Sequence, residues 1–327
     1  MIAGQSMKEI NKIKGKLNSK WKMNDLGPVN LLLGSQVKQT STSISIKQSY
    51  FIEDMLHKYQ QYLITGKPKT VPMMPEVNLS TSMSPTTDDE TLAMQQLPYR
   101  EVVGKLLWLS LCTRPDIIYA TTQCAKFSHN FGPTHWYSLM YILSYLSGTK
   151  DYGLVYSNDY DIDVPMGYFK SNYVYSDADF SRDKDTSKST SGYVYILSGA
   201  PISWMSKQQK EVALSSMESE YYAAGYAIQE ATWVDSLLEE LKMKINKPLI
   251  IQDDNSSAIL FSDHATDHSR TKHIKRRYHF VREAVANKEV ELAKVNTVDN
   301  LADLFTKPLS VTRFTMLRDR MMCNIFD

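Results

Sequence analysis

The second half of this chain predicts an α/β fold, a mixed five-stranded sheet flanked by helices. Three segments that alternate polar with aromatic or β-branched residues come first, separated by polar or glycine-containing turns, as in antiparallel strands. A long helical pattern follows, and two short strand patterns then alternate with helical segments. Antiparallel strands followed by such alternation predict one sheet covered by helices. We expect residues 171–310 to form this domain.

Five segments carry the strand patterns. The first three strands are expected within residues 168–180, 191–199 and 200–207, where side chains of alternating character point to opposite faces. Residues 247–254 (KPLIIQDD) form a short continuous apolar run, which is typical of a strand covered on both faces. Residues 290–295 (VELAKV) predict the last strand.

The helical segments of this half are equally distinct. Residues 215–241 predict the longest helix, with Ser215 or Ser216 as its N-cap. Basic helical segments follow within residues 256–287, and residues 300–307 (NLADLFTK) predict a short last helix.

Residues 1–150 predict a separate, mainly helical domain with one hairpin. A proline-rich stretch, residues 65–98, predicts an irregular loop. The composition changes near residue 150, so we expect a linker at residues 151–170, and a tail at residues 311–327. The other elements expected are helices at residues 6–19, 48–59, 100–112 and 134–148 and strands at residues 31–39 and 43–47.

Charge and cysteine content restrict the classes of function. Lysine and arginine number 37 against 36 aspartates and glutamates, so the chain as a whole does not attract nucleic acid strongly. Cys112, Cys124 and Cys323 form no Cys-x-x-Cys pair, which favours a reducing compartment over a disulfide framework or a zinc module. The sequence shows no signal-peptide pattern and no apolar run of roughly 18 residues. These features predict an intracellular protein without a membrane partner.

Two of the predicted elements offer acids for chemistry. The first strand ends in Asp177 and Asp179, which share a face. In the long helix, Glu220 lies within the small, apolar stripe, whereas Glu218 is about 160° away from it. An acid on a buried stripe is unfavourable unless it is paired or binds metal, so Glu220 is the unusual residue and Glu218 is expected in solvent. The stripe comprises Ala223, Ala224, Ala227, Ala231, Val234 and Leu238.

Two later elements offer further acids. The fourth strand ends in Asp253 and Asp254, at the position where sites on open α/β sheets gather, although Asp254 also fits a helix cap. Asp299 has the position of an N-cap, and Asp303 lies one turn further on. Carboxylates that converge from several elements suit Mg²⁺, and pairs of such ions hydrolyse phosphodiesters.

Long motifs in a fixed order indicate a family. They are YSDADF, KSTSGYVYILSGAPISWMSKQQKEVALSSMESEYYAA, DDNSSAI, HSRTKHIKRRYHFVRE and NLADLFTKPL. This half resembles the C-terminal ribonuclease H domain of copia-type retrotransposon Pol polyproteins. The resemblance implies a ribonuclease H-like fold and an endonuclease that cuts the RNA strand of RNA–DNA hybrids. It also implies metal ligands at Asp177, Glu220, Asp254 and Asp303, with Mg²⁺ as the ion and Mn²⁺ as its alternative.

The first half resembles the end of the reverse transcriptase palm, the thumb and the connection of the same family. The motifs are MNDLGPVNLLLGSQVKQ, YREVVGKLLWLSLCTRPDI and HWYSLMYILSYLSGTKDYGLVY. In that family a Tyr-Val-Asp-Asp segment with the polymerase metal ligands precedes a segment like MIAG, with which this sequence begins. We therefore expect a truncated polymerase half without polymerase activity, whose partner is the remainder of the Pol polyprotein. Its palm-facing leucines, residues 31–33, then lack their natural cover.

A basic cluster is the predicted nucleic-acid contact. Its members are Arg270, Lys272, Lys275, Arg276 and Arg277. Taken alone, the cluster also fits a solvated helix face, but the resemblance favours contact with the phosphates of an RNA–DNA hybrid. Histidines at 264, 268, 273 and 279 are interleaved with it, at spacings irregular for a closed zinc site.

Two other functions fit parts of the pattern. A degenerate relic would retain the fold and the basic cluster and bind nucleic acid without cutting it, but all four acids are present, which favours activity. Integrases share this sheet but carry their acids in the order Asp, Asp, Glu. Here the glutamate comes second, on the first long helix, which argues against an integrase.

Overall fold

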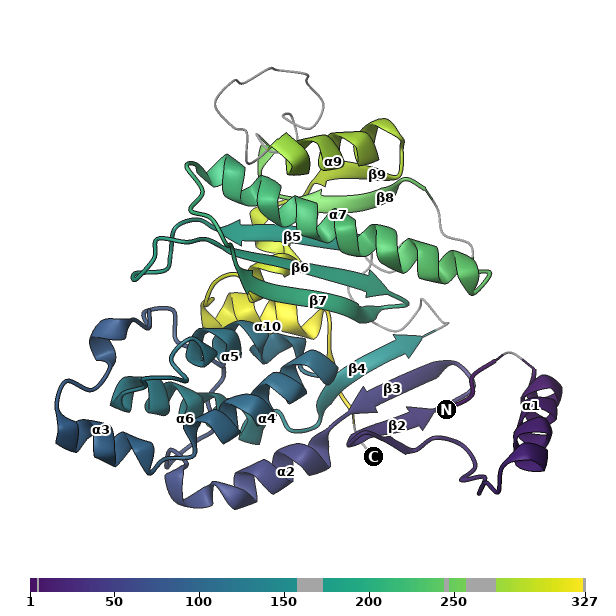
Figure 1. Cartoon of the computed structure of the whole chain (residues 1–327), viewed down its shortest axis with the longest axis horizontal. Coiled ribbons are helices and arrows are strands. Elements are labelled where there is room, and N and C mark those ends of the chain that lie inside the picture. The colour runs from purple at the N-terminus through teal and green to yellow at the C-terminus, as the bar shows by residue number, and fades with distance from the viewer. Residues whose placement is uncertain (5, 158–172, 244–246, 257–274, 326–327) are drawn as a thin grey trace.

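Two sheets and the helices around them make up the molecule (Figure 1). The computed structural model describes residues 1–4, 6–157, 173–243, 247–256 and 275–325, without the side chains of residues 275–278. Within these residues, no helix is both long and apolar enough to cross a bilayer.

The sheet of the second half has the predicted composition. Its strands are β5 (Tyr173–Asp179), β6 (Thr190–Leu197), β7 (Ala200–Gln208), β8 (Leu249–Asp253) and β9 (Val290–Lys294). Their spatial order is β7-β6-β5-β8-β9, with β5, β6 and β7 antiparallel and β8 parallel to both β5 and β9. The predicted mixed five-stranded sheet of a ribonuclease H-like fold is therefore confirmed.

Helices cover one face of this sheet. The long helix α7 (Ser216–Glu240), capped by Ser215, crosses it, and α9 (Lys275–Ala286) lies beside it (Figure 1). Along β5, Val174 belongs to the core under α7 and α9, whereas Tyr175 belongs to the core on the other side. This alternation follows from the two-residue period of a strand and leaves both faces of the sheet buried.

The second face is covered by the first half of the chain and by the C-terminal elements. A single core joins β5 and β6 to α4 (Tyr99–Cys112), α5 (Ile118–Ala125) and α6 (Pro133–Gly148). The expected helices at residues 100–112 and 134–148 are therefore present, and α2 (Ser49–Lys58) packs against α6.

The remaining elements form the first sheet and its surroundings. Its order is β1-β2-β3-β4-β10. These elements are α1 (Met7–Lys20), β1 (Leu31–Leu32), β2 (Ser35–Gln39), β3 (Ser43–Lys47), α3 (Asp88–Gln95), β4 (Tyr152–Ser157), α10 (Val311–Asp319) and β10 (Cys323–Asn324).

Strand pairing and side-chain packing cross the expected domain boundaries. The expected linker contains β4, which pairs with β3 and extends the first sheet. The expected tail contains α10 and β10: Phe314 and Leu317 are buried in the shared core, and β10 pairs with β4. The expected irregular loop also contains the short helix α3, which begins with a capping box at Thr87.

The short helix expected at residues 300–307 differs from its expected form. It is a 3-10 helix, η5 (Leu301–Phe305), and its N-cap is Asn300, not Asp299. Asn300 accepts from the Ala302 amide and donates through Nδ2 to the carbonyl of Ser176, so it fixes η5 to β5. At Gly192 on β6, a Cβ would lie 2.7 Å from Cβ of Phe305, so glycine is what lets η5 approach the sheet this closely.

Candidate metal centre

Three of the predicted acids meet at one edge of the second sheet. Asp177 lies on β5, Glu220 in the first turns of α7, and Asp254 directly after β8. One carboxylate oxygen of each lies within 4.8 Å of those of the other two. The parallel strands β5 and β8 are neighbours, so their carboxyl ends reach the same edge, and α7 begins there.

This group of acids concentrates negative charge that Lys307 offsets only in part. Glu220 is 7% exposed, and its Oε2 has no hydrogen-bond partner among the described residues. Burial raises the pKa of Glu220 well above its usual value, and repulsion from Asp177, Asp253 and Asp254 raises it further. A buried carboxylate in this state is stabilised by a cation. The donor set, oxygen atoms from three elements, suits a hard divalent ion such as Mg²⁺ or Mn²⁺.

The two acids after β8 differ in their surroundings. Asp253 is held in place, because Ser176 Oγ donates to its Oδ2 at 2.9 Å and the Asn255 amide donates to its Oδ1 at 2.8 Å. Burial is the main cause that raises the pKa of Asp253 to about 7. Asp254 is half-buried and is the one that joins Asp177 and Glu220. On β5, Asp179 pairs with Arg182 at 3.4 Å and stays outside the group.

Asp303 lies on the other side of Asp177 and is joined to it through a lysine. The Lys307 ammonium lies 2.7 Å from Oδ1 of Asp303 and 3.4 Å from Oδ2 of Asp177. Arg313 also contacts Asp303, and the Thr306 hydroxyl donates to Asp177. Burial and the charge of Asp177 raise the pKa of Asp303 to about 7, against the opposing effect of Lys307 and Arg313. The structure therefore brings three of the four predicted ligands together directly.

Glu218 is buried, so the expectation that it lies in solvent was wrong. Its side chain is 7% exposed and accepts from the backbone amide of Leu214 at 2.7 Å, while Ser215 Oγ accepts from the Glu218 amide. The carboxylate folds back over the N-terminus of α7, where unpaired amides and the helix dipole favour it. Glu218 therefore closes the helix end and does not point into the group of acids.

Comparison with known proteins identifies the family. The family model for reverse transcriptase (RNA-dependent DNA polymerase) matches residues 1–75. The Pol polyprotein from transposon TNT 1-94 of Nicotiana tabacum is 36% identical over 321 residues, which cover 98% of this chain and 23% of that protein. The putative transposon Ty5-1 protein of Saccharomyces cerevisiae is 30% identical over 232 residues, which cover 70% of this chain and 70% of that protein. The chain belongs to the copia-type retrotransposon Pol polyproteins.

The chain is short beside its polyprotein relatives, since it spans about a fifth of the length of the transposon polyproteins it matches. Among solved structures, the ribonuclease H1 of Halobacterium salinarum is 14% identical, with a TM-score of 0.32, over 42% of this chain and 94% of that one.

Residues that sequence reasoning missed hold the acids of this Pol polyprotein segment in place. Besides Lys307, the buried Gln209 stands out: its Nε2 donates to Ser191 Oγ at 2.8 Å and to the Ser219 carbonyl at 2.9 Å. Gln209 thus ties β6 to the start of α7, one residue before Glu220. The spacing of Asp303 and Lys307, four residues apart, is a signal from which the ion pair could have been anticipated.

The predicted basic cluster falls largely outside the described residues. Arg270 and Lys272 are not described. Lys275, Arg276 and Arg277 begin α9, but their side chains are not described. The histidines at 264, 268 and 273 also lie outside the described residues. Contact with nucleic acid here stays a prediction.

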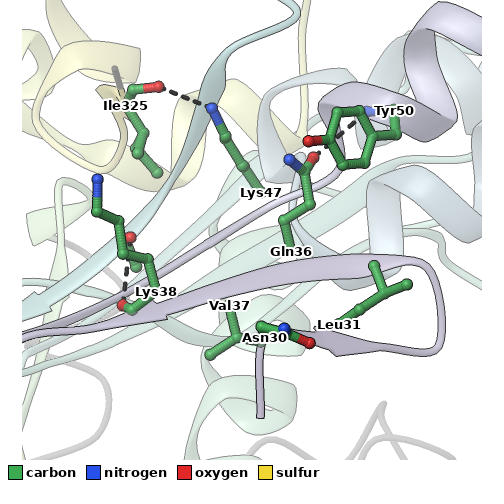
Figure 2. A pocket seen from close by; sticks show the side chains of 9 residues that line it. Asn30, Leu31, Gln36, Val37, Lys38, Lys47, Tyr50 and Ile325 are labelled. Atoms are coloured by element: carbon green, nitrogen blue, oxygen red, sulfur yellow. Dashed lines mark hydrogen bonds between the residues drawn. The ribbon is translucent and has the colours of Figure 1, made fainter. Parts of the chain in front are cut away.

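A separate cavity of about 400 Å³ lies on the first sheet (Figure 2). Its polar groups bond within the protein: Lys47 donates to the carbonyl of Ile325 at 3.0 Å, and Gln36 accepts from the Tyr50 amide at 3.3 Å. The described residues that line it include no acid, histidine or cysteine. They are Asn30, Leu31, Gln36, Val37, Lys38, Ser45, Lys47, Tyr50 and Ile325.

Proposed function

We propose that this Pol polyprotein segment is a divalent-metal-dependent endonuclease that hydrolyses the RNA strand of RNA–DNA hybrids. The observation that carries the proposal is the meeting of Asp177, Glu220 and Asp254, with one buried oxygen of Glu220 left unpaired among the described residues. Three carboxylates at this separation repel one another, so the arrangement is favourable only with a cation between them.

Each acid has a distinct part in this proposal. Asp177, Glu220 and Asp254 would hold one Mg²⁺ or Mn²⁺ ion, and Asp177 with Asp303 would hold a second. Such ions, when bound, supply charge neutralisation at the phosphate and a reactive water at neutral pH. The protein supplies fixed ligands: Gln209 ties the start of α7 to β6, and Asn300 ties η5 to β5. Thr306 orients Asp177 through its hydroxyl.

An RNA–DNA hybrid is the substrate that best suits the rest of the chain. Residues 1–75 match an RNA-dependent DNA polymerase, and copying RNA into DNA leaves such a hybrid. The basic cluster from Arg270 to Arg277 would contact the phosphates of the hybrid, with the remainder of the Pol polyprotein as the protein partner. These contacts position a duplex without reading its sequence.

A second candidate is a protein that binds hybrids without cutting them. The observation in its favour is the Lys307 ammonium, which lies between Asp177 and Asp303 where the second ion would bind. The presence of all four acids favours hydrolysis over binding alone, because an inactive relic has no need to maintain them.

The test is incubation of the purified chain with an end-labelled RNA–DNA hybrid, with Mg²⁺ and with a chelator, beside a DNA duplex of the same sequence. We expect metal-dependent cleavage of the RNA strand only. Glu220→Gln and Asp254→Asn should each lower cleavage by about a hundredfold or more, since metal catalysis is worth several kcal/mol.

The matched control is Glu218→Gln, which retains an oxygen for the Leu214 amide and should leave most activity. Binding of the hybrid with no cleavage in any divalent metal would instead support the binding-only candidate. Full cleavage by Glu220→Gln would refute the assignment of the site.

A further inference from the structure

The two sides of Asp177 are not equivalent. On one side, no lysine or arginine of the described residues forms a salt bridge with Glu220 or Asp254. Towards Asp303, the Lys307 ammonium lies between the two carboxylates, 3.4 Å from Asp177 and 2.7 Å from Asp303. One of the two places where acids converge is therefore open to a cation, and the other already contains one.

The acids beside Lys307 are more firmly held than the lysine is. Asp177 and Asp303 are at most 1% exposed, whereas the Lys307 side chain is 26% exposed. Thr306 bonds to Asp177, and Arg313 bonds to Asp303, so both carboxylates keep contacts that do not involve the lysine. An ammonium on a flexible four-carbon stem with an exposed side can move to solvent while the acids stay in place.

We propose that the Lys307 ammonium is a built-in counter-cation of the Asp177–Asp303 pair, which a divalent ion must displace in order to bind there. The position formed by Asp177, Glu220 and Asp254 then fills first, and the position between Asp177 and Asp303 fills only at higher ion concentration. This inference rests on the proposed function, because it assumes that both positions take divalent ions. It explains how the full chain offsets the charge of Asp177 and Asp303 before it meets metal.

The test is a Mn²⁺ titration of the full chain without substrate, in which electron paramagnetic resonance measures the free ion. The wild-type chain should bind one ion tightly and a second more weakly. In Lys307→Met the weaker affinity should rise by roughly tenfold or more, a change within the usual range for coupled binding equilibria. The tighter affinity should change much less, and Lys307→Arg should keep the second ion weak because it retains the charge.

Lys38→Met is the matched control, since it removes the same charge from an exposed position on β2, in the other sheet. It should leave both affinities unchanged. A thermal melt of each variant shows whether it is folded, and Lys307→Gln, which keeps a polar group without charge, replaces Lys307→Met if that variant unfolds.

The outcomes separate this inference from the proposed function. If the wild-type chain binds two ions but Lys307→Met leaves the weaker affinity unchanged, or tightens both equally, the role of Lys307 is refuted while the metal centre stands. If the wild-type chain binds no ion, or if Asp254→Asn leaves the tighter affinity unchanged, the metal centre and the inference both fail.

Discussion

Burial and the neighbouring carboxylates oppose the ionisation of Glu220 and raise its pKa well above its usual 4.5. A raised pKa means that the folded state binds the proton more tightly than the unfolded state does. The stability from that proton is fully present below about pH 4.5 and is lost as the pH rises through the folded-state pKa. Glu220→Gln, which stays neutral, does not lose it.

We therefore expect Glu220→Gln to gain stability relative to the wild-type chain in a chelating buffer as the pH rises from about 4.5 through the folded-state pKa of Glu220. Thermal unfolding of both proteins across this range measures the difference. Added Mg²⁺ should remove the advantage, since it stabilises only the ionised wild-type site. Glu218→Gln is the control at a carboxylate outside the group, and a difference that stays constant with pH would argue against the charge repulsion.

At the scale of elements, β6 and η5 approach each other closely at Gly192. A Cβ at Gly192 would lie 2.7 Å from Cβ of Phe305 and 2.8 Å from Cγ2 of Thr306, so one of these elements must move. Because η5 carries Asp303, its displacement alters the site as well as the packing. Gly192→Ala should lower the free energy of unfolding by about 1–3 kcal/mol, as overpacking does elsewhere, and reduce hybrid cleavage.

The control for this prediction is Gly104→Ala on α4, where a Cβ meets nothing within 4 Å. Alanine is the better helix former, so this variant should be neutral or more stable by up to about 1 kcal/mol. Urea unfolding measures both. Equal stability of Gly192→Ala and the wild-type chain would show that η5 can move without cost.

Three members of the basic cluster, Lys275, Arg276 and Arg277, lie at the start of α9. Replacing Arg276 and Arg277 by Gln should weaken hybrid binding similarly for every sequence, because interactions with phosphates carry no base information. The slope of log affinity against log salt should flatten by about 0.7–0.9 for each phosphate that the protein no longer neutralises. Replacing Lys20 and Lys22, beyond the predicted nuclease half, is the control. An unchanged slope would assign Arg276 and Arg277 to a solvated helix face.

Local sequence patterns predicted most elements, and the misses at Lys307 and Gln209 have a common cause. Strand alternation and the stripe of α7 give signals within a few residues, so the second sheet and the burial of Glu220 were predictable. Lys307 contacts Asp177, which lies 130 residues earlier in the chain, and Asp303, which lies four residues earlier. No local pattern in the sequence records the contact with Asp177. The bond of Gln209 to Ser219 was missed for the same reason.

At the scale of the whole molecule, the two halves are packed as one. Trp204 on β7 donates to the carbonyl of Ser110 on α4 at 2.8 Å. On α10, Arg318 contacts the hydroxyl of Tyr145 at 3.4 Å, while Arg313 on the same helix contacts Asp303. The helix α10 thus connects the core of the first half to a predicted metal ligand of the second. Composition marks a boundary near residue 150, but it contains no information about which side chains later share a core.

This shared core determines which parts of the first half should be stable. The leucines at residues 31–33 are exposed, with Leu33 at 75%, and α1 has no buried residue. In contrast, α4 and α6 bury most of their apolar side chains against the rest of the molecule. Few buried contacts allow local opening at little cost in free energy, whereas core helices open only with the whole protein.

We therefore expect hydrogen-exchange rates to differ between elements of the first half. We do not expect the first half as a whole to exchange faster than the second. Amides of α1 and the β1–β2 hairpin should exchange by local opening and respond little to dilute denaturant. Amides of α4 and α6 should exchange as slowly as those of β5 and β6, and all four should accelerate together as denaturant approaches the unfolding midpoint. Mass spectrometry of peptic fragments measures each region in the same sample, with β5 as the internal reference. Faster exchange in α4 and α6 than in β5 would mean that the first half unfolds by itself and that the shared core does not couple the halves.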